Sequence, residues 1–251
     1  MTGLPDRDIV SDAQLACAAA AGDREAFARI YDRYADRLHD YCVGLVGDHH
    51  AAADCVQDVF CTAAADLAKL RDPDKLRPWL YAIARNTALR TLHRWRREFA
   101  SDQLPDNPSM GPGPFTLTAQ NELAQLVAQA ADGLSERDRD LLELAYRHGL
   151  TAPDLAVVLG VSQDSVRTLL RRLRYAIERS LGALLVVRRA AQNGCLELAT
   201  TLSSWDGQFT ILMRKRIVRH IESCPTCDAD RRTLVDSVAM LAGALLKELS
   251  Q

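Results

Sequence analysis

Three cysteines and one histidine in the last quarter of the chain have the types and the spacing of metal ligands. They are Cys195, His220, Cys224 and Cys227, in the pattern C-x24-H-x3-C-x2-C. Thiolate sulfur and imidazole nitrogen are usual ligands of structural zinc, and H-x3-C-x2-C brings three of them together at the end of one helix. Four protein ligands leave no open position for water or substrate. We therefore expect one zinc ion with a structural or switching role rather than a catalytic one.

The residues around these ligands are typical of a small helical unit. Ile217, Val218 and Ile221 make the helix that carries His220 amphipathic, and Pro225 shapes a tight turn between the last two cysteines. Backbone N–H groups after such a turn can lower the pKa of the cysteine thiols. Binding of a structural zinc is worth about 10–16 kcal/mol, which is enough to order a unit with little core. For the Cys-x2-Cys pair alone, a turn with two free thiols is the alternative.

The composition favours a globular protein of the cytoplasm. The chain has 251 residues, 48% of them hydrophobic, and a net charge of −2. No apolar stretch reaches the roughly 18 residues of a transmembrane helix, and the polar start does not resemble a signal peptide. Seven cysteines, an odd number, suit a reducing compartment better than a set of disulfides. We expect no membrane contact. Four further cysteines should be buried as small apolar side chains: Cys17, Cys42, Cys55 and Cys61.

Helical periodicity runs through nearly the whole chain, and no alternating pattern predicts a strand. We therefore expect an all-α fold. Ser11, Asp23 and Asp48 can cap the first three helices, and Gly47 can end the second.

Proline and glycine divide the chain into domains. They crowd residues 99–118, which predicts a flexible linker. This linker would join a helical domain, 1–98, to a second helical domain, 119–185. The zinc-binding helical domain would occupy residues 186–251.

A helix-turn-helix pattern occupies the second domain. Gly160 supplies the turn, and Val161 and Val166 would bury the second helix against the first. Ser162 can cap this second helix, which we expect to reach Leu181. A helical hairpin with incidental arginines is the alternative. Six residues of the second helix would face outward, toward a DNA major groove: Gln163, Asp164, Ser165, Arg167, Thr168 and Arg171.

Two arginine clusters stand out on a chain of low net charge. Five arginines lie between residues 85 and 97, and five more between residues 167 and 179. Two basic faces indicate two contacts with phosphates, although a solvated helix face is the alternative for either cluster alone. Enzymatic activity is not expected, because the chain has no glycine-rich phosphate loop, no nucleophile motif and no open metal position.

Four short runs follow one another at characteristic separations. They are A-F-x-x-I-Y-x-x-Y from Ala26, D-C-V-Q-D-V-F from Asp54, W-L-x-x-I-A-R-N from Trp79 and L-S-E-R-D-R from Leu134. Together they resemble the extracytoplasmic function (group IV) sigma factors of bacterial RNA polymerase. The first three runs resemble region two of that family, and the last, with the helix-turn-helix, resembles region four.

The resemblance implies two partners, core RNA polymerase and promoter DNA. The helix with Asp54, Gln57, Asp58 and Phe60 would dock on the clamp coiled coil of the polymerase largest subunit. The loop from Leu70 to Pro78 and the helix after it would hold the melted −10 element, and the helix-turn-helix would bind the −35 element. Four polar side chains would contact −10 phosphates or base edges: Arg85, Asn86, Arg90 and Arg94.

Sigma factors of this group normally end near the position of Leu181, whereas this chain continues with a pattern similar to the zinc-containing anti-sigma family. There the module wraps against its sigma factor and blocks polymerase-binding surfaces. The resemblance therefore implies regulation in cis, through contact of the 186–251 domain with the sigma domains. Two forms of regulation are open. In the first, the module inhibits the sigma domains until zinc is lost or its cysteines are oxidised. In the second, the module is required for activity. The alternative, a stand-alone zinc- or redox-responsive helix-turn-helix regulator, leaves the runs at Asp54 and Trp79 unexplained.

Overall fold

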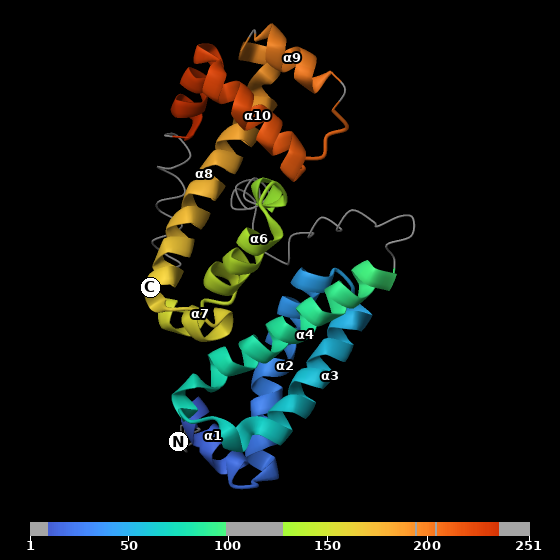
Figure 1. The fold of residues 1–251 in the computed structure, drawn as a ribbon, viewed down its shortest axis with the longest axis vertical. Helices are drawn as coiled ribbons and strands as arrows, with labels where there is room; N and C mark the ends of the chain where they lie inside the picture. Colours follow the sequence, from blue (N-terminus) through green and yellow to red (C-terminus); the bar gives the residue numbers. More distant parts are fainter. Residues whose placement is uncertain (1–9, 99–127, 194, 204, 236–251) are drawn as a thin grey trace, which may run out of the picture. The chain divides into compact units, whose positions relative to one another are not determined.

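The computed structural model consists of helices and their connections, and no strand occurs in the residues that it describes. These residues are 10–98, 128–193, 195–203 and 205–235 (Figure 1). The all-α fold expected from the helical periodicity is therefore confirmed. Among the same residues, no helix is both long and apolar enough to cross a membrane. The expected linker, 99–118, lies outside the described residues.

Packing divides the chain into two units. Unit 1 consists of Met1–Pro108 and Glu143–Val166, and unit 2 consists of Ser109–Leu142 and Arg167–Gln251. The expected second domain, 119–185, is thus shared between the units, because its middle segment packs with the N-terminal helices.

Four helices form the frame of unit 1: α1 (Asp12–Ala20), α2 (Arg24–Val46), α3 (His49–Asp66) and α4 (Leu76–Glu98). Two short 3-10 turns, Leu67–Lys69 and Pro73–Lys75, connect α3 to α4. The helix α2 packs against α1, α3 and α4. Its buried residues recur at helical spacing, which explains why it lies at the centre of the bundle: Ala26, Ile30, Tyr34, Leu38, Tyr41, Cys42 and Val46.

The predicted capping residues begin and end these helices. Ser11 and Gln14 form a capping box, in which each side chain accepts a hydrogen bond from the other's backbone N–H, at 3.2 and 2.9 Å. Asp23 and Asp48 accept backbone N–H groups in the first turns of α2 and α3. Gly47 ends α2 with a φ of 74°, a left-handed conformation that glycine adopts at little cost. Each cap is worth about 1 kcal/mol, so local chemistry fixes these boundaries.

Only two of the four cysteines expected in the core are buried. Cys42 and Cys55 are 0% and 2% exposed, between α2 and α3. For Cys17 and Cys61 the prediction is wrong, because both side chains are exposed. Cys17 lies among alanines, which mark no clear apolar face of a helix, and Cys61 lies on the side of α3 away from its buried residues Val56 and Phe60.

The segment Glu143–Val166 of unit 1 contains a π-helical turn, η3 (Glu143–Arg147), and the helix α7 (Ala152–Leu159). The helix α7 packs against α4. Lys75, the last residue of the 3-10 turn before α4, lies 3.8 Å from the carboxylate of Asp154 on α7. The first helix of the helix-turn-helix therefore packs with the N-terminal bundle.

His148 is at the centre of this contact. Its ring lies beside those of Tyr41 and Tyr81, with centroid distances of 5.5 and 5.2 Å. The Tyr81 hydroxyl is 3.0 Å from His148 Nδ1, and Arg77 donates a hydrogen bond to the His148 carbonyl. Burial, together with the charges of neighbouring arginines, lowers the pKa of His148 to about 4. The imidazole is therefore neutral at pH 7, and its Nδ1 can accept a hydrogen bond from the Tyr81 hydroxyl.

Protonation of His148 should destabilise unit 1. The folded-state pKa is about 4, and an unfolded histidine titrates near 6.5, so between these values the unfolded state binds more protons and stability rises with pH. Through this residue we expect the free energy of unfolding to be about 2 kcal/mol lower at pH 5 than at pH 7.5, as measured by urea denaturation. The His148→Gln variant should lack this part of the pH dependence. Equal pH dependence in the variant and the parent protein would contradict the assignment.

Unit 2 is organised around one long helix, α8 (Gln163–Asn193), which begins in unit 1 and continues through unit 2. The other helical parts of unit 2 are residues 128–132, α6 (Glu136–Leu142), α9 (Leu196–Leu202), α10 (Ile211–Ser223) and residues 225–235.

The helix α8 extends well past Leu181, where we expected it to end, and reaches Asn193. It also crosses residue 185, the expected border of the zinc-binding domain. The reason is a continuous core, because the apolar positions of α8 keep their helical spacing and find cover from α9 and α10. This core contains Ala183, Leu184, Val186, Val187, Leu198, Phe209, Met213, Ile217, Val218, Ile221 and Cys227.

Candidate metal centre and nucleic-acid interfaces

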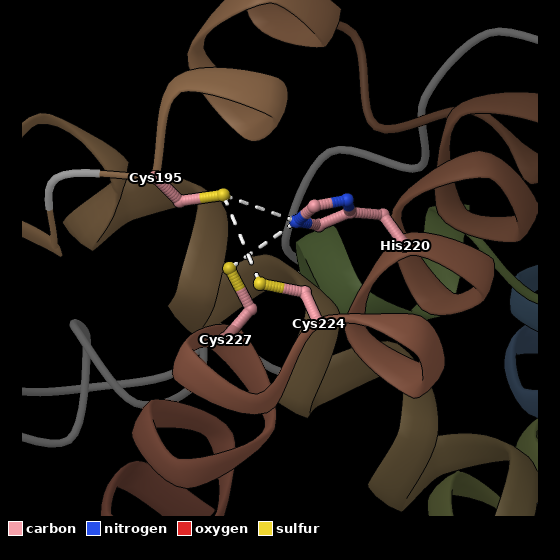
Figure 2. Close-up of side chains that lie close together, drawn as sticks. All are labelled: Cys195, His220, Cys224 and Cys227. Atoms are coloured by element: carbon pink, nitrogen blue, oxygen red, sulfur yellow. Dashed lines mark hydrogen bonds between the residues drawn. The ribbon is translucent and has the colours of Figure 1, made fainter.

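The four predicted metal ligands lie together (Figure 2). Cys195 is the N-cap of α9, His220 lies in the last turn of α10, Cys224 follows α10 directly, and Cys227 belongs to the helix at 225–235. Their ligand atoms, three sulfurs and one ring nitrogen, all lie within 4.8 Å of one another. The prediction that these side chains form one cluster is confirmed.

The distances between these ligand atoms resemble those of a tetrahedral zinc site. Cys195 Sγ is 3.4 Å from His220 Nε2 and 3.9 Å from Cys224 Sγ, and His220 Nε2 is 3.3 Å from Cys227 Sγ. Typical zinc bonds give edges of about 3.8 Å between two sulfurs and about 3.6 Å between sulfur and nitrogen. These three separations lie within about 0.3 Å of the zinc values. The widest separation in the cluster, 4.8 Å, would have to close by about 1 Å.

The second nitrogen of His220 faces a carboxylate. His220 is 6% exposed, and its Nδ1 has no well-aligned hydrogen-bond partner within the described residues. A carboxylate oxygen of Glu197 lies 3.5 Å from this nitrogen. With a metal on Nε2, Nδ1 would carry the proton and face Glu197, an arrangement that orients metal-bound imidazoles. Sequence reasoning missed Glu197, whose only signal is its place two positions after Cys195.

The surroundings give the cysteine thiols different acidities. The backbone N–H of Cys227, with that of Thr226, lowers the pKa of Cys224, as expected for this turn. Burial raises the pKa of Cys227 to about 12, and the neighbouring thiols of Cys195 and Cys224 add to this effect. The Leu198 N–H donates a hydrogen bond to Cys195 Sγ at 3.4 Å. A metal that binds all three sulfurs as thiolates must displace protons, so its affinity rises with pH.

The helix-turn-helix has the local geometry that the sequence predicts, with one exception. Thr151 and Asp154 form a capping box at the start of α7, and Gly160 ends α7 with a φ of 65°. Val166 is fully buried, as expected, whereas Val161 is 36% exposed. The prediction that Val161 is buried is wrong, because this residue lies in the turn before α8 and not on its buried face.

Five of the six residues predicted to read the major groove are exposed on α8, and Thr168 is half-buried. Because an α-helix turns about 100° per residue, Gln163, Arg167 and Arg171 share one stripe. Ser165 lies away from this stripe, and its backbone N–H and hydroxyl contact Ser162 Oγ at the helix start. The stripe is thus an exposed polar side of α8.

The helix α4 brings together part of the predicted −10 contact. Asn86 and Arg90 line an open hollow of about 500 Å³ between α3 and α4, together with Thr62 and His93. The predicted contact Arg94 is exposed one turn beyond Arg90. Arg85 does not line the hollow and is half-buried. Sequence reasoning missed His93, although its spacing from Asn86 and Arg90 places it on the same side of the helix.

Three of the four predicted polymerase contacts form an exposed polar strip on α3. Asp54, Gln57 and Asp58 are exposed. Phe60 is only 6% exposed, and its ring packs against Tyr31 at a centroid distance of 4.6 Å. Phe60 is therefore a core residue that fixes α3 on α2, and its side chain does not belong to the exposed strip.

Comparison with known proteins identifies the family. The profile of Sigma-70 region 2 matches residues 30–98, and that of Sigma-70, region 4 matches residues 124–177. The RNA polymerase sigma-H factor of Pseudomonas aeruginosa is 30% identical over 184 residues, 69% of this chain and 95% of that protein. The ECF RNA polymerase sigma factor SigW of Bacillus subtilis is 25% identical over 170 residues, 64% of this chain and 91% of that protein. The chain belongs to the extracytoplasmic function sigma-70 factors.

Another relative of this sigma factor is a longer protein. The probable RNA polymerase sigma factor RfaY of Xanthomonas campestris pv. campestris is 31% identical over 170 residues, which cover 65% of this chain but 42% of that protein. Among solved structures, CnrH in complex with the cytosolic domain of CnrY aligns with a TM-score of 0.50 at 29% identity, over 68% of this chain and 97% of that chain. Like its relatives, the chain serves promoter recognition by RNA polymerase.

The region-four match of this sigma factor ends at residue 177, so all four residues of the Cys/His cluster lie beyond it. A close contact nevertheless joins them to region four within unit 2. Arg214 on α10 donates a hydrogen bond to the Gly133 carbonyl at 2.5 Å, and the Ser180 hydroxyl donates to the Ala130 carbonyl at 2.6 Å. A Cβ atom on Gly133 would lie 2.8 Å from Ser180 Oγ and 3.0 Å from the Phe209 ring. Only glycine fits at this crossing without displacing its neighbours.

Replacing Gly133 by alanine should loosen this contact. Gly133 is not among the positive-φ glycines, so alanine causes no backbone strain at this position. Any loss of stability therefore results from the crowding around the new Cβ atom. We expect the zinc-loaded Gly133→Ala protein to lose about 1–3 kcal/mol of stability in thermal unfolding. Ser180→Ala removes the nearest atom, so the double variant should lose less than the sum of the two single losses. Additive losses would contradict the close approach.

Proposed function

We propose that this sigma factor binds one zinc ion through Cys195, His220, Cys224 and Cys227, and that the zinc-bound module regulates it in cis. The observation that carries this proposal is the cluster itself, in which three sulfurs and one imidazole nitrogen from separate helices lie within 4.8 Å (Figure 2). Bound zinc would supply a cross-link between these helices. With four protein ligands it would leave no position for a reacting group.

The module would act on region four through their common core. Cys227 is fully buried in the core that also holds Ala183, Leu184 and Val187 of α8. Loss of zinc would release the ligand-bearing helices and uncover apolar side chains of α8, each worth about 1.5–3 kcal/mol when fully buried. We therefore propose that the zinc-loaded module supports region four.

Restraint by the module is the less favoured form of regulation. An inhibitory module that masks the −35 reader would have to cover the outward side of α8. Arg167 and Arg171, which lie in unit 2 together with the module, remain exposed. This observation favours support over masking of the DNA-reading residues.

We propose that the two regions divide the promoter and polymerase contacts between them. Region four would bind the −35 element through the exposed side of α8. Region two would bind the melted −10 element through Asn86, Arg90 and Arg94 on α4, where the arginines can pair with phosphates. The acidic strip on α3 would bind a basic surface of core polymerase, the clamp of its largest subunit. A stand-alone helix-turn-helix regulator would not account for the region-two match at residues 30–98.

Charge reversal on α3 tests the polymerase contact. Asp58→Lys should weaken binding of the full chain to core RNA polymerase at least tenfold, because it places like charges opposite each other at the interface. Asp36→Lys makes the same change at an exposed position of α2 and should leave the affinity within about twofold. Surface-immobilised core polymerase provides the measurement. Equal losses in both variants would show that net charge, and not the strip on α3, controls binding.

Removal of one ligand tests regulation by zinc. Cys224→Ser should lose bound zinc and at least tenfold of its specific transcription. Transcription is measured with reconstituted polymerase on fragmented chromosomal DNA of the source organism, by counting the 5′ ends of the transcripts. The variant's affinity for core polymerase should stay unchanged, because region two is untouched. Cys61→Ser, at an exposed cysteine outside the cluster, is the matched control.

The remaining outcomes of this experiment separate the alternatives. Higher transcription from Cys224→Ser would mean that the module restrains the sigma factor. Unchanged transcription together with lost zinc would mean that the module does not regulate it. Retained zinc would remove Cys224 from the ligand set.

A further inference from the structure

The helix α10 carries an exposed basic side that neither predicted arginine cluster includes. Lys215, Arg216 and Arg219 are exposed, and the helical rotation places them within an arc of about 100°. Within the described residues, none of the three forms an ion pair or a hydrogen bond. Arg214, the fourth cation of this helix, points instead to the Gly133 carbonyl. The outward side of α10 is thus a cluster of three free cations.

The acidic residue next to these cations is already neutralised. Glu222 on α10 pairs with Arg179 on α8 at 2.5 Å. The guanidinium of Arg179 also lies 5.4 Å from the ring centre of Tyr175, which is 58% exposed. Glu222 is therefore not available to the cations, and Arg179 brings the basic side of α10 into contact with α8.

The same pair connects the exposed cations of α10 to those of α8 within unit 2. Arg171 and Arg172 are exposed on α8, two turns before Arg179, and Arg219 lies about one turn before Glu222 on α10. The eight-residue step from Arg171 to Arg179 is about 12 Å along α8, which is the length of three or four base pairs of DNA. We call these cations the basic band: Arg171, Arg172, Arg179, Lys215, Arg216 and Arg219.

The basic band has a fixed geometry. Ile217 and Ile221, on the opposite side of α10, are 0% and 2% exposed in the core shared with α8. The Arg214–Gly133 hydrogen bond fixes the same helix to the residues before α6. A surface held in this way loses little entropy when it binds a ligand.

We infer that the basic side of α10 binds the phosphate backbone of DNA next to the bases that α8 reads. This inference rests on the proposed role of α8 at the −35 element. Exposed cations whose acidic neighbour on α10, Glu222, is already paired suit phosphates, and the Arg179–Glu222 pair links them to Arg171 and Arg172 on α8. Leu212 is the exposed apolar residue on this side of α10. One such side chain offers too little apolar area to bind a membrane surface or to form a protein interface. The module would thereby lengthen the DNA footprint of region four.

The inference is tested with the zinc-loaded full chain and a fluorescent random-sequence 30-base-pair duplex, by anisotropy between 50 and 300 mM KCl. Phosphate contacts do not depend on sequence, so a random duplex is a suitable probe. Arg219→Ala should weaken binding about three- to tenfold at 100 mM KCl and lower the slope of log affinity against log salt by about 0.9. Zinc content and thermal stability should match those of the parent protein.

The matched control is Arg188→Ala. Arg188 is exposed on α8 and hydrogen-bonded to Gln129 at 2.6 Å, and nine residues after Arg179 it lies on the opposite side of the helix. The Arg188→Ala variant removes the same charge outside the basic band, so it should keep the parent protein's slope of log affinity against log salt. Equal effects of Arg188→Ala and Arg219→Ala would overturn the inference, because they would report net charge alone.

Two further outcomes would also overturn it, in different ways. If Arg171→Ala lowers the slope but Arg219→Ala does not, α8 binds DNA and α10 does not. If neither variant changes the slope, the proposed DNA contact of α8 fails as well. A loss of affinity of Arg219→Ala for core polymerase or for vesicles with phosphatidylserine, with unchanged duplex binding, would assign the basic side of α10 to those partners.

Discussion

Burial of one side of α8 is the constraint on which unit 2 depends. This helix spans Gln163–Asn193, and a helix of that length is stable in water only when its apolar side is covered. Its first part packs in the helix-turn-helix through Val166, and its last part is covered by α9 and α10 through Leu184 and Val187. The metal cluster sits where the covering helices end. Zinc bound to this cluster would add to a modest core, so that a small module with few apolar residues could hold the end of a long helix.

Local chemistry explains why much of the fold and of the candidate site is predictable. The caps at Ser11, Asp23 and Asp48, and the glycine at position 47, depend only on residues within one turn. The same holds for three of the four metal ligands, since the spacing from His220 to Cys227 fits one helix end. Cys195 is distant in sequence, and only the full four-residue pattern could assign it.

Long-range packing explains what the sequence does not predict. Phe60 lies in the core because Tyr31 of another helix covers it, and α8 continues beyond Leu181 because the later helices supply partners for its apolar side. The periodicity of apolar residues along one helix predicts neither the burial of Phe60 nor the length of α8. The place of α7 beside α4 depends on His148, a polar residue whose surroundings come from helices at least 60 positions away. The basic side of α10 is not evident from the sequence, because core residues separate its cations along the chain.

The unbroken path of α8 from the helix-turn-helix to the metal cluster has a thermodynamic consequence. With DNA on the exposed residues of α8 and zinc on the helices that cover its other end, both ligands would favour the same ordered form of one helix. Linkage then requires reciprocity: the factor by which zinc strengthens DNA binding equals the factor by which DNA strengthens zinc binding. The sigma factor would hold its metal most tightly while seated on a promoter. Zinc would exchange most readily from molecules that are free of DNA.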